Sequence, residues 1–120
     1  PDGERYLRVD GNIDEEVTVI QSTGYPQDEN LMELLFLISN LKDLGAKKVR
    51  VVVPYMGYAR QEKRFHDGEA VSAKIVANLI QSAGADEFIT FNIHEKCVLD
   101  FFDIPTTSIC ISGRCFFISL

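Results

Sequence analysis

The feature that most limits the possible folds is a short joint that occurs twice in the chain. At residues 44–49 and again at residues 83–88, a helical pattern passes through Gly-Ala into an apolar run. Each joint connects a helix to a strand, so the two together give successive strand–helix–strand units. Strands linked in this way pair in parallel, with right-handed crossovers. The repeat predicts an α/β fold with a parallel sheet flanked by helices.

Apolar runs and helical periodicity place the individual elements along the chain. Runs rich in β-branched and aromatic residues predict strands at residues 5–10, 17–21, 49–53 and 88–93. Helical spacing predicts long helices that begin near Asp28 and Ala70, and a short helix over residues 95–102. We expect Asp28 or Asn30 to cap the first helix, because a short polar side chain can accept from its free N–H groups.

Each long helix carries apolar residues spaced three and four apart, which marks the face expected to be buried. In the first helix this face comprises Leu31, Leu34, Leu35, Ile38 and Leu41, widened by Phe36 and Leu37. In the second helix the residues expected inside are Val71, Ile75, Val76, Leu79 and Ile80. The 120 residues suggest that both helices belong to one small domain.

The overall composition argues against several classes of protein. Hydrophobic residues make up 46% and charged residues 25%, which is typical of a soluble globular protein. The net charge of -6 argues against a nucleic-acid or anionic-membrane partner. No apolar run approaches the roughly 20 residues that a membrane span needs, and no signal peptide stands at the N-terminus. We therefore expect a cytoplasmic location.

The cysteines give little support to a fold held together by disulfides or by a bound metal. Cys97, Cys110 and Cys115 are odd in number and show no CxxC spacing. These two features argue against a disulfide framework and against a structural zinc site. We expect the three side chains to be reduced.

A polar, aromatic and basic segment, residues 54–64 (PYMGYARQEKR), directly follows the strand expected at 49–53. In open α/β sheets, ligands bind just beyond the carboxyl ends of strands. Arg60, Lys63 and Arg64 favour an anionic ligand, most simply phosphate. The alternative is a solvated loop whose charges serve no ligand, and position and composition leave both open.

Two other strand ends should meet this segment at one edge of the sheet. They carry residues 21–23 and His94, which would place Arg60 and Gln61 near His94. His94 is either structural or a supplementary ligand of a metal–phosphate complex, since Mg²⁺ prefers oxygen ligands. The sequence holds neither a GxxxxGK[ST] loop nor a GxGxxG motif, so an ATP site here would lack a P-loop.

In detail, residues 54–64 resemble the signature of ribose-phosphate pyrophosphokinases, also called PRPP synthetases. Further segments resemble this family in the same order, at residues 2–6, 21–23, 28–35, 71–74, 83–86, 93–94 and 101–105. The resemblance covers residues 1–105 and is nearest to archaeal-type members. It implies a phosphoribosyltransferase-like α/β domain, transfer of the diphosphate of ATP to ribose 5-phosphate with Mg²⁺, and homo-oligomers built from dimers.

The resemblance also assigns roles to individual residues. Arg60 and Gln61 match the family's ATP-binding Arg-Gln pair, and His94 matches a metal-linked histidine. Asp2 and Glu4, on residue type alone either solvated surface or an amine-binding pair, match acidic residues that meet the adenine from a neighbouring subunit. No catalytic residue is expected in this chain, because the family carries a catalytic Lys and Arg in a second domain that is absent here.

The chain departs from the family pattern at both ends. The family's first strand and helix and its whole second domain are missing, and Glu62 stands where Asp is usual. We expect a partial N-terminal, ATP-side domain at residues 1–105, a divergent tail at residues 106–120, and no PRPP synthesis by the chain alone. Two alternatives stay open, a non-catalytic regulatory subunit of a synthetase and a non-functional gene fragment.

Overall fold

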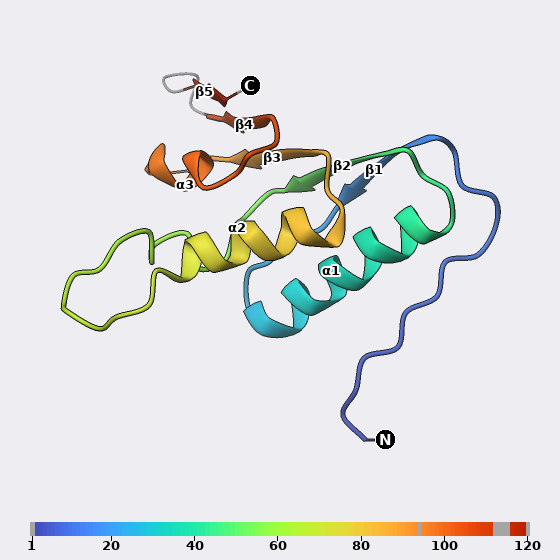
Figure 1. Cartoon of the computed structure of the whole chain (residues 1–120), viewed down its shortest axis with the longest axis horizontal. Coiled ribbons are helices and arrows are strands. Elements are labelled where there is room, and N and C mark those ends of the chain that lie inside the picture. Colours follow the sequence, from blue (N-terminus) through green and yellow to red (C-terminus); the bar gives the residue numbers. More distant parts are fainter. Residues whose placement is uncertain (1, 94, 112–115, 120) are drawn as a thin grey trace.

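The computed structural model describes residues 2–93 and 95–111, and the backbone course of residues 116–119 (Figure 1). Its strands form one sheet in the order β1-β2-β3-β4-β5. The strands are β1 (Glu16–Ile20), β2 (Lys48–Val53), β3 (Glu87–Phe91), β4 (Thr106–Ile109) and β5 (Phe116–Ser119). The helices are α1 (Gln27–Asp43), α2 (Ser72–Ala83) and α3 (Cys97–Asp100).

The sheet is parallel from β1 to β4, and each of these strands is connected to the next through a helix. Only β5, which pairs with β4, runs antiparallel. The predicted α/β fold with a parallel sheet is therefore confirmed. Right-handed crossovers between strands in sequential order place the helices on one face of the sheet. Figure 1 shows α1 and α2 next to each other on that face, and no helix of the described residues covers the other.

The hydrophobic core lies between the sheet and the two long helices. In β2, Val49, Val51 and Val53 point toward the helices and are fully buried, whereas the residues between them are half-buried. They share one cluster with buried residues of both helices, Leu34, Ile38, Leu41, Ala73, Val76, Ala77 and Ile80. The core thus fixes the direction of β2, whose carboxyl end leads into residues 54–64.

The buried faces of the helices are narrower than the sequence predicts. In α2 the buried residues are Ala73, Val76, Ala77 and Ile80, so Ile75 and Leu79 lie on the opposite side, 53% and 42% exposed. The expectation that Ile75 and Leu79 lie inside is wrong, because small alanines can occupy a buried helix face. Phe36 of α1 is likewise 40% exposed. None of the helices in the described residues is long and apolar enough to cross a membrane.

Two predictions near the N-terminus are also wrong. Residues 5–10 form no strand; they run along α1, where Arg5 pairs with Glu33 at 2.6 Å. Alternating apolar residues make a strand only where the backbone finds a pairing partner. Neither Asp28 nor Asn30 caps α1, because the helix begins one residue before Asp28, and the Asn30 side chain instead donates to the Gly24 carbonyl at 2.9 Å.

The region after residue 105 continues the sheet. β4 pairs in parallel with β3, from Phe88 opposite Thr106 to Phe91 opposite Ile109. The division between a domain at 1–105 and a tail at 106–120 stays a prediction based on sequence pattern. Cys110 is disulfide-bonded, which corrects the expectation of reduced cysteines for this residue, since an odd count still permits one pair. Cys97 is free and exposed.

Candidate functional site

The carboxyl ends of β1, β2 and β3 meet at one edge of the sheet, as the topology predicts. The Gln21 N–H donates to the Val52 carbonyl at 3.0 Å, and the Thr23 N–H donates to the Tyr55 carbonyl at 3.0 Å. These bonds extend the β1–β2 pairing beyond the strands. They bring the predicted segment at residues 21–23 against the start of residues 54–64.

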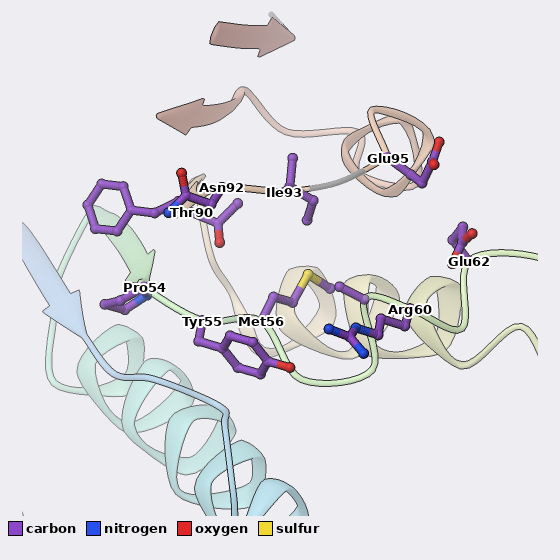
Figure 2. A pocket seen from close by; sticks show the side chains of 11 residues that line it. Pro54, Tyr55, Met56, Arg60, Glu62, Thr90, Asn92, Ile93 and Glu95 are labelled. Atoms are coloured by element: carbon purple, nitrogen blue, oxygen red, sulfur yellow. The ribbon is translucent and has the colours of Figure 1, made fainter. Parts of the chain in front are cut away.

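A cavity of about 400 Å³ opens at this edge, between the segment after β2 and the end of β3 (Figure 2). We call it the sheet-edge cavity. From the β2 side its lining residues are Pro54, Tyr55, Met56, Ala59, Arg60 and Glu62. From the β3 side they are Thr90, Phe91, Asn92, Ile93 and Glu95. The cavity therefore lies where ligands bind in parallel sheets, beyond the carboxyl ends of two neighbouring strands.

Thr23 fastens the segment after β2 to the end of β1. Its hydroxyl accepts from the Gly57 N–H at 2.8 Å and donates to the Tyr55 carbonyl at 3.2 Å, and the residue is only 2% exposed. A Cβ added at Gly57 would lie 2.3 Å from the Thr23 carbonyl oxygen, closer than atoms can approach. Only glycine fits this position, so the close packing of Gly57 on Thr23 fixes the path of the chain toward Arg60.

Tyr58 makes a second attachment, to the first turn of α1. Its hydroxyl donates to a carboxylate oxygen of Asp28. This hydrogen bond raises the pKa of Tyr58, and burial and the negative charge of Asp28 act in the same direction. The backbone at Tyr58 has a φ of 67°, in the left-handed region that is uncommon for residues other than glycine.

The predicted ATP-binding pair takes two different positions. Arg60 is exposed and lines the sheet-edge cavity, whereas Gln61 does not line it. The Gln61 N–H donates to the Tyr58 carbonyl at 2.9 Å, and its carbonyl accepts from the Ala73 N–H at 3.1 Å. His94 lies outside the described residues, although its neighbours Ile93 and Glu95 both line the cavity.

The other basic residues of the segment point to different surroundings. Lys63 lies over the Phe65 ring, with its ammonium 5.2 Å from the ring centroid. Arg64 lines a separate cavity near the start of α2, together with Lys74. Among residues 54–64, Arg60 is therefore the cation that the structure brings to the sheet-edge cavity.

Two carboxylates, Glu62 and Glu95, line the same cavity from opposite sides. Partial burial raises the pKa of the Cys97 thiol, and the negative charges of Glu62 and Glu95 raise it further. Carboxylate oxygens suit Mg²⁺, but no cluster of three His, Cys, Asp or Glu residues that could hold a metal occurs among the described residues. Glu62 and Glu95 are thus the described carboxylates of the lining that fit an ion held mainly by its own phosphate and water ligands.

The acidic pair near the N-terminus lies elsewhere. Glu4 lines a second cavity of about 820 Å³, between residues 3–6 and α1, which we call the arm cavity. Asp2 does not line it; one of its carboxylate oxygens accepts from the Glu4 N–H at 3.0 Å. The structure thus does not bring Asp2 and Glu4 to the sheet-edge cavity of the same chain.

Sequence reasoning did not single out Thr90 or Asn92. Asn92 turns the chain after β3 with a φ of 52°, and its side-chain oxygen accepts from the Ile111 N–H at 3.1 Å. Asparagine tolerates this left-handed conformation better than most residues, so an Asn near the end of a predicted strand is the available signal. Thr90 is fully buried, and its hydroxyl has no hydrogen-bond partner among the described residues. Nothing in the sequence distinguishes it from other strand threonines.

Comparison with known proteins points to one family. Residues 1–84 match the family model described as the N-terminal domain of ribose phosphate pyrophosphokinase. The chain is 95% identical over 113 residues to a ribose-phosphate pyrophosphokinase of Methanobrevibacter smithii, covering 94% of this chain and 38% of the relative. It is 68% identical over 105 residues to one of Methanothermobacter thermautotrophicus, covering 88% of this chain and 37% of the relative.

A solved structure agrees with these sequence matches. The phosphoribosylpyrophosphate synthetase from Mycobacterium smegmatis superposes with a TM-score of 0.87 at 34% identity, over 91% of this chain and 37% of that one. The chain thus spans less than two fifths of the length of these relatives, as the expectation of a partial N-terminal domain requires. On this evidence the chain belongs to the ribose phosphate pyrophosphokinase family and corresponds to the N-terminal part of its members.

Proposed function

We propose that the sheet-edge cavity binds the phosphates of ATP, as the nucleotide side of an enzyme that transfers diphosphate from ATP to ribose 5-phosphate. The observation that supports this most is the position of Arg60, on the lining of a cavity formed by two parallel strand ends. A guanidinium offers a planar fork of donors that matches phosphate oxygens. Diphosphoryl transfer depends mainly on positioning and on neutralising phosphate charge, and Arg60 suits both.

Within this proposal, Arg60 contacts phosphate oxygens, and Tyr55 of the same lining offers a ring face on which a base can stack. Mg²⁺ would neutralise charge on the phosphates, and Glu62 and Glu95 are the described carboxylates that could meet its water ligands. His94 remains the proposed protein ligand of the ion. The proposal places the catalytic groups and most of the ribose 5-phosphate site in the part of the relatives that this chain does not span.

The proposal includes assembly into homo-oligomers in the cytoplasm. Asp2 and Glu4 lie apart from the sheet-edge cavity of their own chain, which suits the role that the family resemblance gives them, contact with the adenine of a neighbouring copy. The 120-residue chain, which spans less than two fifths of these relatives, should bind Mg–ATP but form no PRPP. An assay with ATP, Mg²⁺ and ribose 5-phosphate tests this, and clear turnover by the purified chain contradicts it.

The test of the phosphate site is the affinity for Mg–ATP, measured by isothermal titration calorimetry on the wild type, Arg60→Ala and Lys63→Ala. Hydrogen bonds to charged groups contribute about 1.5–3 kcal/mol, so Arg60→Ala should weaken binding by about tenfold to a hundredfold. Lys63→Ala removes the same charge from the same segment but outside the cavity, and should weaken binding by less than about threefold. Equal losses in the two variants would contradict the proposal, since only a diffuse charge effect would remain.

A further inference from the structure

The turn that carries Arg60 contains a backbone conformation that needs outside support. Tyr58 has a φ of 67°, and such left-handed conformations are unfavourable for residues other than glycine. They persist only where the surrounding structure holds them. We therefore looked for contacts that hold the backbone before Tyr58, after it and at its side chain.

On the N-terminal side, Gly57 is fixed by its close packing on Thr23 and by the 2.8 Å bond from its N–H to the Thr23 hydroxyl. On the C-terminal side, the Gln61 N–H donates to the Tyr58 carbonyl at 2.9 Å and closes a turn around Arg60. The Gln61 carbonyl then accepts from Ala73 in the first turn of α2 at 3.1 Å.

The Tyr58 side chain provides the support in the middle of this turn. Its hydroxyl donates to Asp28 in the first turn of α1, and its ring is partly buried against the core. Asp28 lines the arm cavity and does not line the sheet-edge cavity. The bond therefore joins the turn that carries Arg60 to the first turn of α1, outside the sheet-edge cavity.

We propose that Tyr58 is a positioning residue, whose hydrogen bond to Asp28 holds residues 58–61 in the turn that presents Arg60 to the sheet-edge cavity. Tyr58 itself does not line the cavity, so it acts on a ligand through Arg60. The identity of the ligand as Mg–ATP rests on the proposed function. The claim that Tyr58 holds the turn does not depend on it.

The test uses the whole chain and two measurements, amide hydrogen exchange by NMR without ligand and affinity for Mg–ATP. In Tyr58→Phe, the Gln61 amide should exchange about tenfold faster, because the turn loses a hydrogen bond to a charged group. Mg–ATP affinity should fall by a similar factor while core amides keep their rates. Asp28→Ala should reproduce both effects, and the double variant should add little to either single variant.

Two controls separate positioning from general damage. Asp28→Asn keeps an oxygen that can accept from the Tyr58 hydroxyl but loses the charge, so its Gln61 exchange rate should lie between those of the wild type and Asp28→Ala. Tyr25→Phe removes a hydroxyl from a side chain that is 89% exposed just before α1, and should change neither measurement.

The outcomes distinguish this inference from the proposed function. An unchanged Gln61 exchange rate in Tyr58→Phe overturns the holding of the turn. Faster exchange with unchanged Mg–ATP affinity overturns the positioning of Arg60. Wild-type affinity in Arg60→Ala, or no binding by the wild type, overturns the proposed function, while the exchange rates still decide whether Asp28 holds the turn.

Discussion

The sheet-edge cavity and the arm cavity are built in different ways. The sheet-edge cavity is walled by two parallel strand ends, and its segment after β2 is fastened by the buried Thr23. The arm cavity is walled on one side by residues 3–6, which form no regular element and are held by ion pairs from Arg5 to Glu29 and Glu33. Backbone pairing and tight packing define the first cavity, whereas partly exposed charges define the second. A preformed anion site is therefore expected at the first and an adaptable surface at the second.

The largest effect should come from Gly57→Ala. A Cβ at this position would lie 2.3 Å from a backbone oxygen that cannot move aside, so the segment must shift. Overpacking of this kind typically costs about 1–3 kcal/mol, and we expect the loss in the free energy of unfolding to fall in that range. Chemical denaturation measures it.

Gly24→Ala is the matched control for this variant. The added Cβ would lie 3.3 Å from Cδ1 of Tyr55, a side-chain atom that can give by a few tenths of an ångström. If Gly24→Ala destabilises the chain as much as Gly57→Ala, tight backbone packing is not what sets the sheet-edge cavity apart.

A smaller effect is expected in the arm, from Arg5→Ala. The Arg5 side chain is 33% exposed and its partners Glu29 and Glu33 are more exposed still, so the two ion pairs should together contribute no more than about 1 kcal/mol. The loss should shrink further at high salt, because mobile ions screen exposed pairs. A loss as large as that of Gly57→Ala, measured at the same salt, would show that the arm is as firmly built as the sheet edge.

The smallest effect should appear in the titration of Cys97, which feels the charges of two carboxylates that line the sheet-edge cavity. Partial burial is the largest cause that raises the pKa of this thiol, and the charges of Glu62 and Glu95 raise it further, so the neutral thiol persists to higher pH than usual. Glu95→Gln removes one of these charges and should lower the pKa, which increases the thiolate fraction and the rate of alkylation at a given pH. An unchanged rate–pH profile would place Glu95 away from Cys97.

Much of the fold could be predicted because each of the two Gly-Ala joints marks both the end of a helix and the start of a strand. At these joints Asp86, itself a joint residue, accepts from the Val49 N–H at 2.8 Å and pairs with Lys42 at 2.6 Å. These tertiary contacts stabilise the same helix-to-strand connections that the local sequence pattern predicts. Residues 5–10 show the limit, since an alternating pattern does not reveal whether a sheet edge is available to pair with it.

The site could be predicted to the extent that topology determines it. Arg60 follows a buried strand, so its place at the sheet edge follows from the parallel order. The separation of Gln61 from the cavity could not be foreseen, because it depends on the turn that Tyr58 closes through its carbonyl. Thr90 and Asn92 enter the site through the register of β3 with β2 and β4, which local sequence does not encode.

The most direct test of the account is an NMR titration of the wild-type chain with inorganic triphosphate and Mg²⁺, a probe that carries the phosphates but no adenine. We predict that the amide signals that shift most belong to the segment after β2 and the end of β3, around Arg60 and Asn92. The amide signals of residues 3–6 should keep their chemical shifts. Shifts concentrated in the arm cavity, or no saturable shift at the sheet edge, would contradict the claim that Arg60 marks a phosphate site.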